Sequence, residues 1–295
     1  MTFDYGEANG TSMCKISVHY LGPHTWSAKF PAAGGKKQSP INLNTSFVTY
    51  DETLSCLSID LGGAMPQKIS MGSHNFHVYV GGNGGNAFLQ SGPLTSDYHL
   101  VQFHFHWGSG NTWGSEHLVN GVSSPAELHC VFVNNKYVSN EVALTNPDGF
   151  TVVGVFLQIG NRPNSTFERL VCALSNMRNG DEKIIEPQLD LRKLLPDDLS
   201  KYYTYPGSLT TPPCSECVTW ILLDEPIVVT ENQFLLLLHH IYCRSTDYVV
   251  SMQLVLRVEV RTTFVQYALW DHVGFFLHFR VLEAFLQLPF RQTLF

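Results

Sequence analysis

The 295-residue sequence is poor in charge and has no long uninterrupted apolar run. Only 15% of its residues are charged, and acidic residues outnumber basic ones, giving a formal net charge of -7 at pH 7. Nucleic-acid binding needs a basic face against the phosphates, so this balance argues against nucleic acid as the main partner. No apolar stretch reaches the ~20 residues of a membrane-spanning helix, and we expect none.

The sequence also lacks the motifs of several common enzyme and export classes. There is no HExxH, which argues against a metalloprotease, and the glycine-rich run 81–86 lacks the spacing of a phosphate-binding loop. The first residues show neither the basic nor the apolar segment of a secretory leader, so we expect a cytoplasmic protein with reduced thiols. Cys214 and Cys217 form a C-x-x-C pair, but no second pair completes a structural zinc site.

What the sequence does contain is a set of short β-rich runs separated by turn residues. Hydrophobic residues make up 44% of the chain, enough for the sizeable core of a folded domain. There is no internal repeat and no parallel strand–helix–strand alternation. Residues 22–50 are predicted to form an ordered loop, helical spacing predicts a helix over 163–178 and a second short helix over 188–201, and strands are predicted over 75–80, 98–107, 126–133, 151–159 and 217–223.

One predicted strand carries two histidines on one face. Alternate side chains of a strand share a face, so Gln102, His104 and His106 point the same way. His129 shares a face with Glu127 in another predicted strand, and it completes a three-histidine site if the two strands are neighbours. Three neutral imidazoles and a water are the ligands of many catalytic zinc ions. Gln102 and Glu127 could each accept the N–H of the histidine two residues later. The alternative is a structural histidine pair without a metal.

Several longer motifs, in order and in spacing, resemble those of the α-class carbonic anhydrase family. The motifs are QSPIN at 38–42, QFHFHWG at 102–108, SEH at 115–117, AELH at 126–129, SLTTPP at 208–213 and ECVTW at 216–220. The resemblance runs from about Tyr5 to Gln233, which predicts a carbonic anhydrase domain over residues 1–233. It implies a single β-rich α+β domain around a large, mostly antiparallel twisted sheet, with a zinc site in a central cleft.

The resemblance implies a zinc enzyme that reversibly hydrates carbon dioxide to bicarbonate and a proton, acting as a monomer on a small-molecule substrate and serving pH regulation. His104, His106 and His129 are the implied Zn²⁺ ligands. Thr210 would accept a hydrogen bond from zinc-bound hydroxide and donate its own hydroxyl hydrogen bond to Glu116, and His74 would shuttle the released proton. The implied substrate pocket and the wetter wall beside it comprise Val131, Val152, Leu209, Thr211, Val218, Trp220, Tyr5, His77 and Gln102.

The sequence departs from the family in two segments. Residues 11–21 are an apparent insertion, expected to form a surface loop. Residues 234–295 lack the Asn-x-Arg-Pro-x-Gln segment that normally precedes the family's final strand, so they are predicted to be a divergent tail. Loss of that segment would remove backbone support for His106. The alternative function is therefore a catalytically impaired carbonic-anhydrase-like protein.

Overall fold

The computed structural model describes residues 23–61, 67–72, 75–81, 87–186 and 188–242. Tyr5, His74, the 11–21 segment and the tail from residue 243 onward lie outside the described residues. None of the described helices combines the length and the apolar character that crossing a membrane would require.

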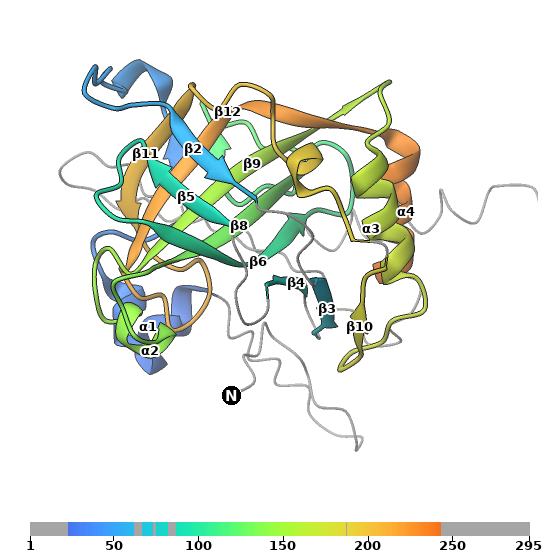
Figure 1. Ribbon diagram of the computed structural model, residues 1–295, viewed down its shortest axis with the longest axis horizontal. Helices are drawn as coiled ribbons and strands as arrows, with labels where there is room; N and C mark the ends of the chain where they lie inside the picture. Colours follow the sequence, from blue (N-terminus) through green and yellow to red (C-terminus); the bar gives the residue numbers. More distant parts are fainter. Residues whose placement is uncertain (1–22, 62–66, 73–74, 82–86, 187, 243–295) are drawn as a thin grey trace, which may run out of the picture. The chain divides into compact units, whose positions relative to one another are not determined.

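A ten-stranded twisted sheet organises the described part of the chain (Figure 1). Neighbouring strands are antiparallel except for the parallel pair β9–β12, which confirms the predicted β-rich fold with a mostly antiparallel sheet. β5 also pairs with β6 and with β2, and a separate two-stranded parallel sheet joins β1 (Asn42–Leu43) to β7 (Leu118–Val119). In spatial order, the main path is β10 (Glu182–Ile184), β3 (Gln67–Met71), β4 (Phe76–Val80), β6 (Tyr98–Trp107), β8 (Ala126–Asn134), β9 (Phe150–Gly160), β12 (Val218–Thr230) and β11 (Tyr202–Gly207), with β5 (Phe88–Ser91) and β2 (Leu57–Asp60) off this path.

The predicted long strands agree with β4, β6, β8 and β9 to within a residue or two at each end. β12 continues to Thr230, well beyond the predicted end at 223, because a register shift between Leu223 and Ile227 lets it resume pairing with β9. The strands β2, β3, β5, β10 and β11, each of three to six residues, were not among the predicted ranges.

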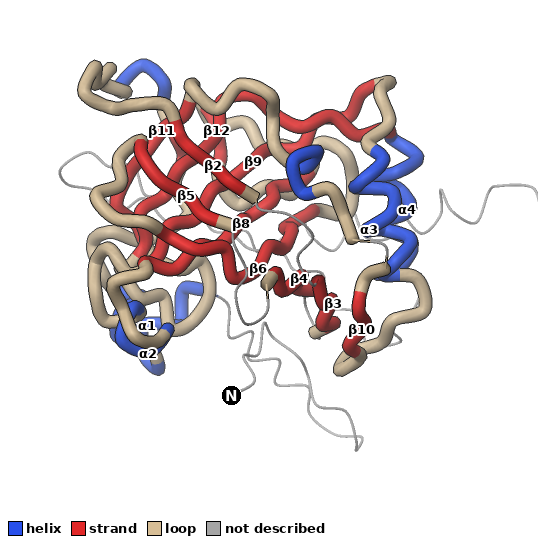
Figure 2. The backbone as a smooth tube through the Cα atoms, in the orientation of Figure 1, coloured by secondary structure: helices blue, strands red, loops and turns tan. Residues whose placement is uncertain are grey.

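Helices are few and lie around the sheet (Figure 2). α3 (Ser165–Leu174) lies within the predicted helix 163–178, and the Asn164 side chain caps it by accepting the backbone N–H groups of Thr166 and Phe167. The predicted helix over 188–201 is wrong: only the 3₁₀ turn η4 (Leu191–Leu194) forms, and Pro196, which has no N–H, follows it. The other helical segments are η1 (Pro23–Thr25), α1 (Trp26–Lys29), η2 (Pro31–Gly34), η3 (Thr45–Phe47), α2 (Asn140–Ala143) and α4 (Glu231–Tyr242).

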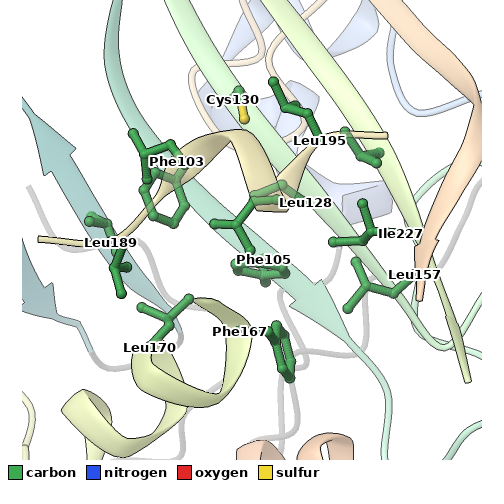
Figure 3. Close-up of a cluster of buried hydrophobic side chains, with 14 of the residues drawn as sticks. Phe103, Phe105, Leu128, Cys130, Leu157, Phe167, Leu170, Leu189, Leu195 and Ile227 are labelled. Atoms are coloured by element: carbon green, nitrogen blue, oxygen red, sulfur yellow. The ribbon is translucent and has the colours of Figure 1, made fainter. Parts of the chain in front are cut away.

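The main hydrophobic core lies against one face of the sheet. Phe103 and Phe105 of β6 and Leu128 and Cys130 of β8 point into it, and Phe167 of α3 packs edge-on against Phe105 with ring centroids 5.7 Å apart (Figure 3). Because these residues alternate with the histidines along both strands, the histidines occupy the opposite face.

α4 spans the predicted domain boundary at residue 233. Phe234, Leu237 and Leu238 are buried in the same core as α3, so the first residues after the boundary pack as part of the domain. The remainder of the predicted tail lies outside the described residues, and the boundary itself stays a prediction.

Candidate active site

β6 and β8 bring the three histidines together. In their antiparallel register His104 lies opposite His129, and His106 lies opposite Glu127. The ring centroids are 5.0 Å apart for His104 and His106, 5.2 Å for His104 and His129, and 4.7 Å for His106 and His129. One ligand atom of each ring lies within 4.8 Å of the others, so the group is compact enough to hold one metal ion.

The chemistry of this group fits zinc. His106 Nε2 is buried and has no hydrogen-bond partner among the described residues, a costly state that coordination of a cation would relieve. Burial is the largest cause that lowers the pKa of all three histidines, which favours the neutral imidazole that coordinates metals.

Two neighbouring side chains orient the ligand rings. Gln102 Oε1 lies 2.9 Å from His104 Nδ1, and Glu127 Oε1 lies 2.7 Å from His129 Nε2. Each contact engages one ring nitrogen and leaves the other to face a metal ion. Such partners set the tautomer and the orientation of ligating histidines.

Glu127 is completely buried and contacts two histidines at once. Its Oε1 lies 2.6 Å from His117 Nδ1, and its Oε2 accepts the backbone N–H of His117 at 2.8 Å. Burial alone would raise the pKa of Glu127, but electrostatic attraction to the His117 and His129 rings, with hydrogen bonds from both, holds it well below its ordinary value. An ionised carboxylate accepts from both rings.

Gly154 makes room for this carboxylate. It lies opposite His129 on β9, and a Cβ added there would stand 3.3 Å from Glu127 Oε1 and 2.6 Å from a methyl carbon of Leu222. The sequence analysis did not single out Gly154. A glycine among the β-branched residues of 151–155 is the available signal, because a glycine inside a strand marks a close approach.

Glu116 lies beside the histidine group. Its Oε1 is 3.3 Å from His106 Nδ1, and its Oε2 is 3.7 Å from His129 Nδ1. Burial first, and then the charge of Glu127, raise the pKa of Glu116 well above its ordinary value, while the nearby Thr210 side chain opposes the shift. The structure thus brings Glu116 and Thr210 together, and both to the histidines. Neither carboxyl oxygen of Glu116 has a hydrogen bond of normal geometry among the described residues.

An apolar wall lies on the same face of the sheet. Val152, Val218 and Trp220 are buried in one cluster, with Val131 and Leu209 partly buried against it. The Trp220 ring centroid is 4.9 Å from that of His129, which joins the wall to the histidine group. Thr211 is partly buried just beyond Thr210.

His77 of β4 also borders the group, with its ring centroid 5.1 Å from that of His104 and its pKa lowered by burial. His74 and Tyr5, the other residues expected here, lie outside the described residues.

Comparison with known proteins identifies the family. Residues 21–263 match the model of the family described as eukaryotic-type carbonic anhydrase. The match covers most of the chain and extends past residue 233, where the resemblance of individual motifs ends. It confirms the resemblance seen in the sequence, and this chain therefore belongs to the eukaryotic-type carbonic anhydrase family.

Proposed function

We propose that this protein catalyses the reversible hydration of carbon dioxide to bicarbonate and a proton, with a zinc ion held by His104, His106 and His129. The observation that carries the proposal is the convergence of three neutral, mostly buried imidazoles beside an apolar wall. Bound zinc lowers the pKa of a water to about 7, which supplies hydroxide at neutral pH.

Thr210 and Glu116 are assigned to orient the attacking oxygen. The Thr210 hydroxyl lies beside Glu116. Burial favours the protonated acid of Glu116, but the positive charge of a bound zinc ion would favour its carboxylate. A carboxylate that accepts a hydrogen bond from the Thr210 hydroxyl leaves the threonine oxygen with acceptor capacity only. A fixed acceptor at this position directs a lone pair of the attacking oxygen at the substrate carbon.

The apolar wall is assigned to hold carbon dioxide. The substrate has no net charge and is poorly hydrated, so it is suited to a surface made by Val131, Val152, Leu209, Val218 and Trp220. Thr211, His77 and Gln102 are assigned to the wetter side, as is Tyr5, which lies outside the described residues. His74 is assigned to carry the released proton to solvent, because a histidine of unperturbed pKa near ~6.5 exchanges protons readily at neutral pH.

We further propose a monomer with reduced thiols in the cytoplasm. The five cysteines in the described part of the chain are all free, which supports reduced thiols.

The test is stopped-flow hydration of carbon dioxide by the full chain, with zinc measured on the same sample. Fast hydration that is lost on chelation and restored by zinc is expected. Thr210→Ala should keep its zinc and lose about 10²–10³ in kcat, as for removal of a positioned polar group in other active sites. Stoichiometric zinc without hydration would contradict the proposed activity and favour the impaired alternative.

A further inference from the structure

A chain of buried hydrogen bonds extends from the histidine group into the segment that carries Thr210. It begins with His129, Glu127 and His117, whose contacts are described above. The other ring nitrogen of His117, Nε2, lies 2.6 Å from the hydroxyl of Tyr205 on β11. The sequence analysis gave His117 no role beyond its place in the SEH motif and did not single out Tyr205.

The chain continues from Tyr205 to Ser208. The Tyr205 hydroxyl lies 2.9 Å from Ser39 Oγ. The backbone N–H of Ser208 donates to Ser39 Oγ at 3.1 Å, and the backbone N–H of Ser39 donates to Ser208 Oγ at 2.9 Å. This reciprocal pair fixes Ser208, which directly precedes Leu209 and Thr210.

The numbers of donors and acceptors on each group fix which group donates in each hydrogen bond of this series. A carboxylate at Glu127 accepts from both rings, so in the imidazole form of His117 the remaining nitrogen, Nε2, is an acceptor and the Tyr205 hydroxyl is its donor. Tyr205 then accepts from the Ser39 hydroxyl, whose oxygen accepts the N–H of Ser208. Every donor along the route meets an acceptor, so each group has one orientation.

Packing leaves little room for the chain to rearrange. A Cβ at Gly207 would overlap Ser39 Oγ and would stand 2.7 Å from Trp220 Cδ1 and 2.8 Å from Tyr205 Cε2. The indole of Trp220 donates to the Ser208 carbonyl at 3.0 Å and stacks on the Tyr205 ring, with the two planes 7° apart. The phenol is thus clamped between His117 and Ser39.

We infer that Tyr205 and Ser39 are positioning residues: Tyr205 holds the His117–Glu127 pair and thereby His129, and Ser39 ties the same phenol to Ser208 and thereby to Thr210. The inference rests on the proposed function for its effect on turnover. Its effect on metal binding is independent of the reaction.

The test compares Tyr205→Phe with Tyr203→Phe. Tyr203 lies two residues earlier on β11, and its hydroxyl donates to Asp224 at the surface. The control therefore loses the same hydroxyl oxygen at a position that takes no part in the buried hydrogen-bond series. Zinc dissociation into excess chelator should be about tenfold faster for Tyr205→Phe, at the lower end of the usual effect of groups supporting metal ligands. Tyr203→Phe should match the wild type.

Ser39→Ala separates the two halves of the inference. It should leave zinc dissociation within about twofold of wild type and lower kcat by about tenfold with little change in KM, because it loosens the Thr210 segment and not the ligand. Equal zinc dissociation in Tyr205→Phe and Tyr203→Phe would overturn the first half. Wild-type kcat in Ser39→Ala would overturn the second half, and this variant still tests that half if Tyr205→Phe does not fold.

The proposed function can fail separately. If wild-type protein binds zinc without hydrating carbon dioxide, faster zinc loss from Tyr205→Phe would still support the role of Tyr205. A wild-type chain that takes up no zinc would overturn both proposals.

Discussion

His104 and His129 lie directly opposite each other on neighbouring antiparallel strands, with their ring centroids 5.2 Å apart. Opposite residues of an antiparallel pair project to the same face, so the register of β6 against β8 creates the histidine group. A one-residue slip of either strand would turn the histidines of that strand toward the hydrophobic core.

His104→Ala should therefore abolish stoichiometric zinc binding, with a loss of affinity beyond the roughly 10- to 100-fold cost of removing a supporting group. Zinc content after dialysis against a weak chelator measures the effect. His99→Ala is the matched control, since His99 is on the same strand but pairs with Asn135 at the surface. Full zinc in His104→Ala would exclude His104 as a ligand.

Glu127→Gln should weaken zinc binding by about 10- to 100-fold. In the carboxylate, Oε1 contacts both ring nitrogens and Oε2 accepts the backbone N–H of His117, whereas the amide has a single acceptor oxygen and its NH₂ group can accept none of these three N–H groups. A chelator competition titration measures the change. Glu182→Gln, which removes a carboxylate from an exposed ion pair with Lys68, should leave the affinity unchanged. Unchanged affinity in Glu127→Gln would contradict the orienting role of this carboxylate.

The local sequence pattern correctly predicted which face of the strand carries the histidines. It did not predict most of the residues that contact them. Strand alternation placed Gln102, His104 and His106 on one face, because that relation depends on the strand alone. The pairing of β6 with β8 depends on tertiary packing, and so does the meeting of His117 with Tyr205, 88 residues apart in sequence. No local pattern encodes such a contact.

The predicted helix over 188–201 also failed because the backbone conformation of this segment depends on tertiary packing. Its leucines have helical spacing, yet Leu191, Leu194 and Leu195 reach the core from a 3₁₀ turn and the extended residue after it. Burial of the side chains could be predicted, but the backbone that achieves it could not, because short segments follow tertiary packing over intrinsic preference.

Gly154→Ala should destabilise the protein by about 1–3 kcal/mol, as overpacking of a filled interior does. The added methyl group would press on Leu222 and on the carboxylate of Glu127, so zinc affinity should fall as well. Urea denaturation of the zinc-free protein measures the first effect. Gly110→Ala, where a Cβ meets nothing within 4 Å, should change stability by less than about 0.5 kcal/mol. Equal stability of the two variants would show that the sheet relaxes around residue 154.

Alkylation should distinguish the cysteines by burial and by thiolate content. Cys130 lines an apolar void behind β8, where burial raises its pKa to about 12, and burial also raises the pKa of Cys217 to about 12. A raised pKa keeps both as thiols at pH 8, and only the thiolate reacts with iodoacetamide. Peptide mass spectrometry of the native protein should therefore show label at the exposed Cys56 and Cys172 well before Cys130 and Cys217, with all four labelled in urea. Native labelling of Cys130 as fast as Cys56 would mean that the sheet opens next to His129, and the ligand strand would then be less rigid than its packing indicates.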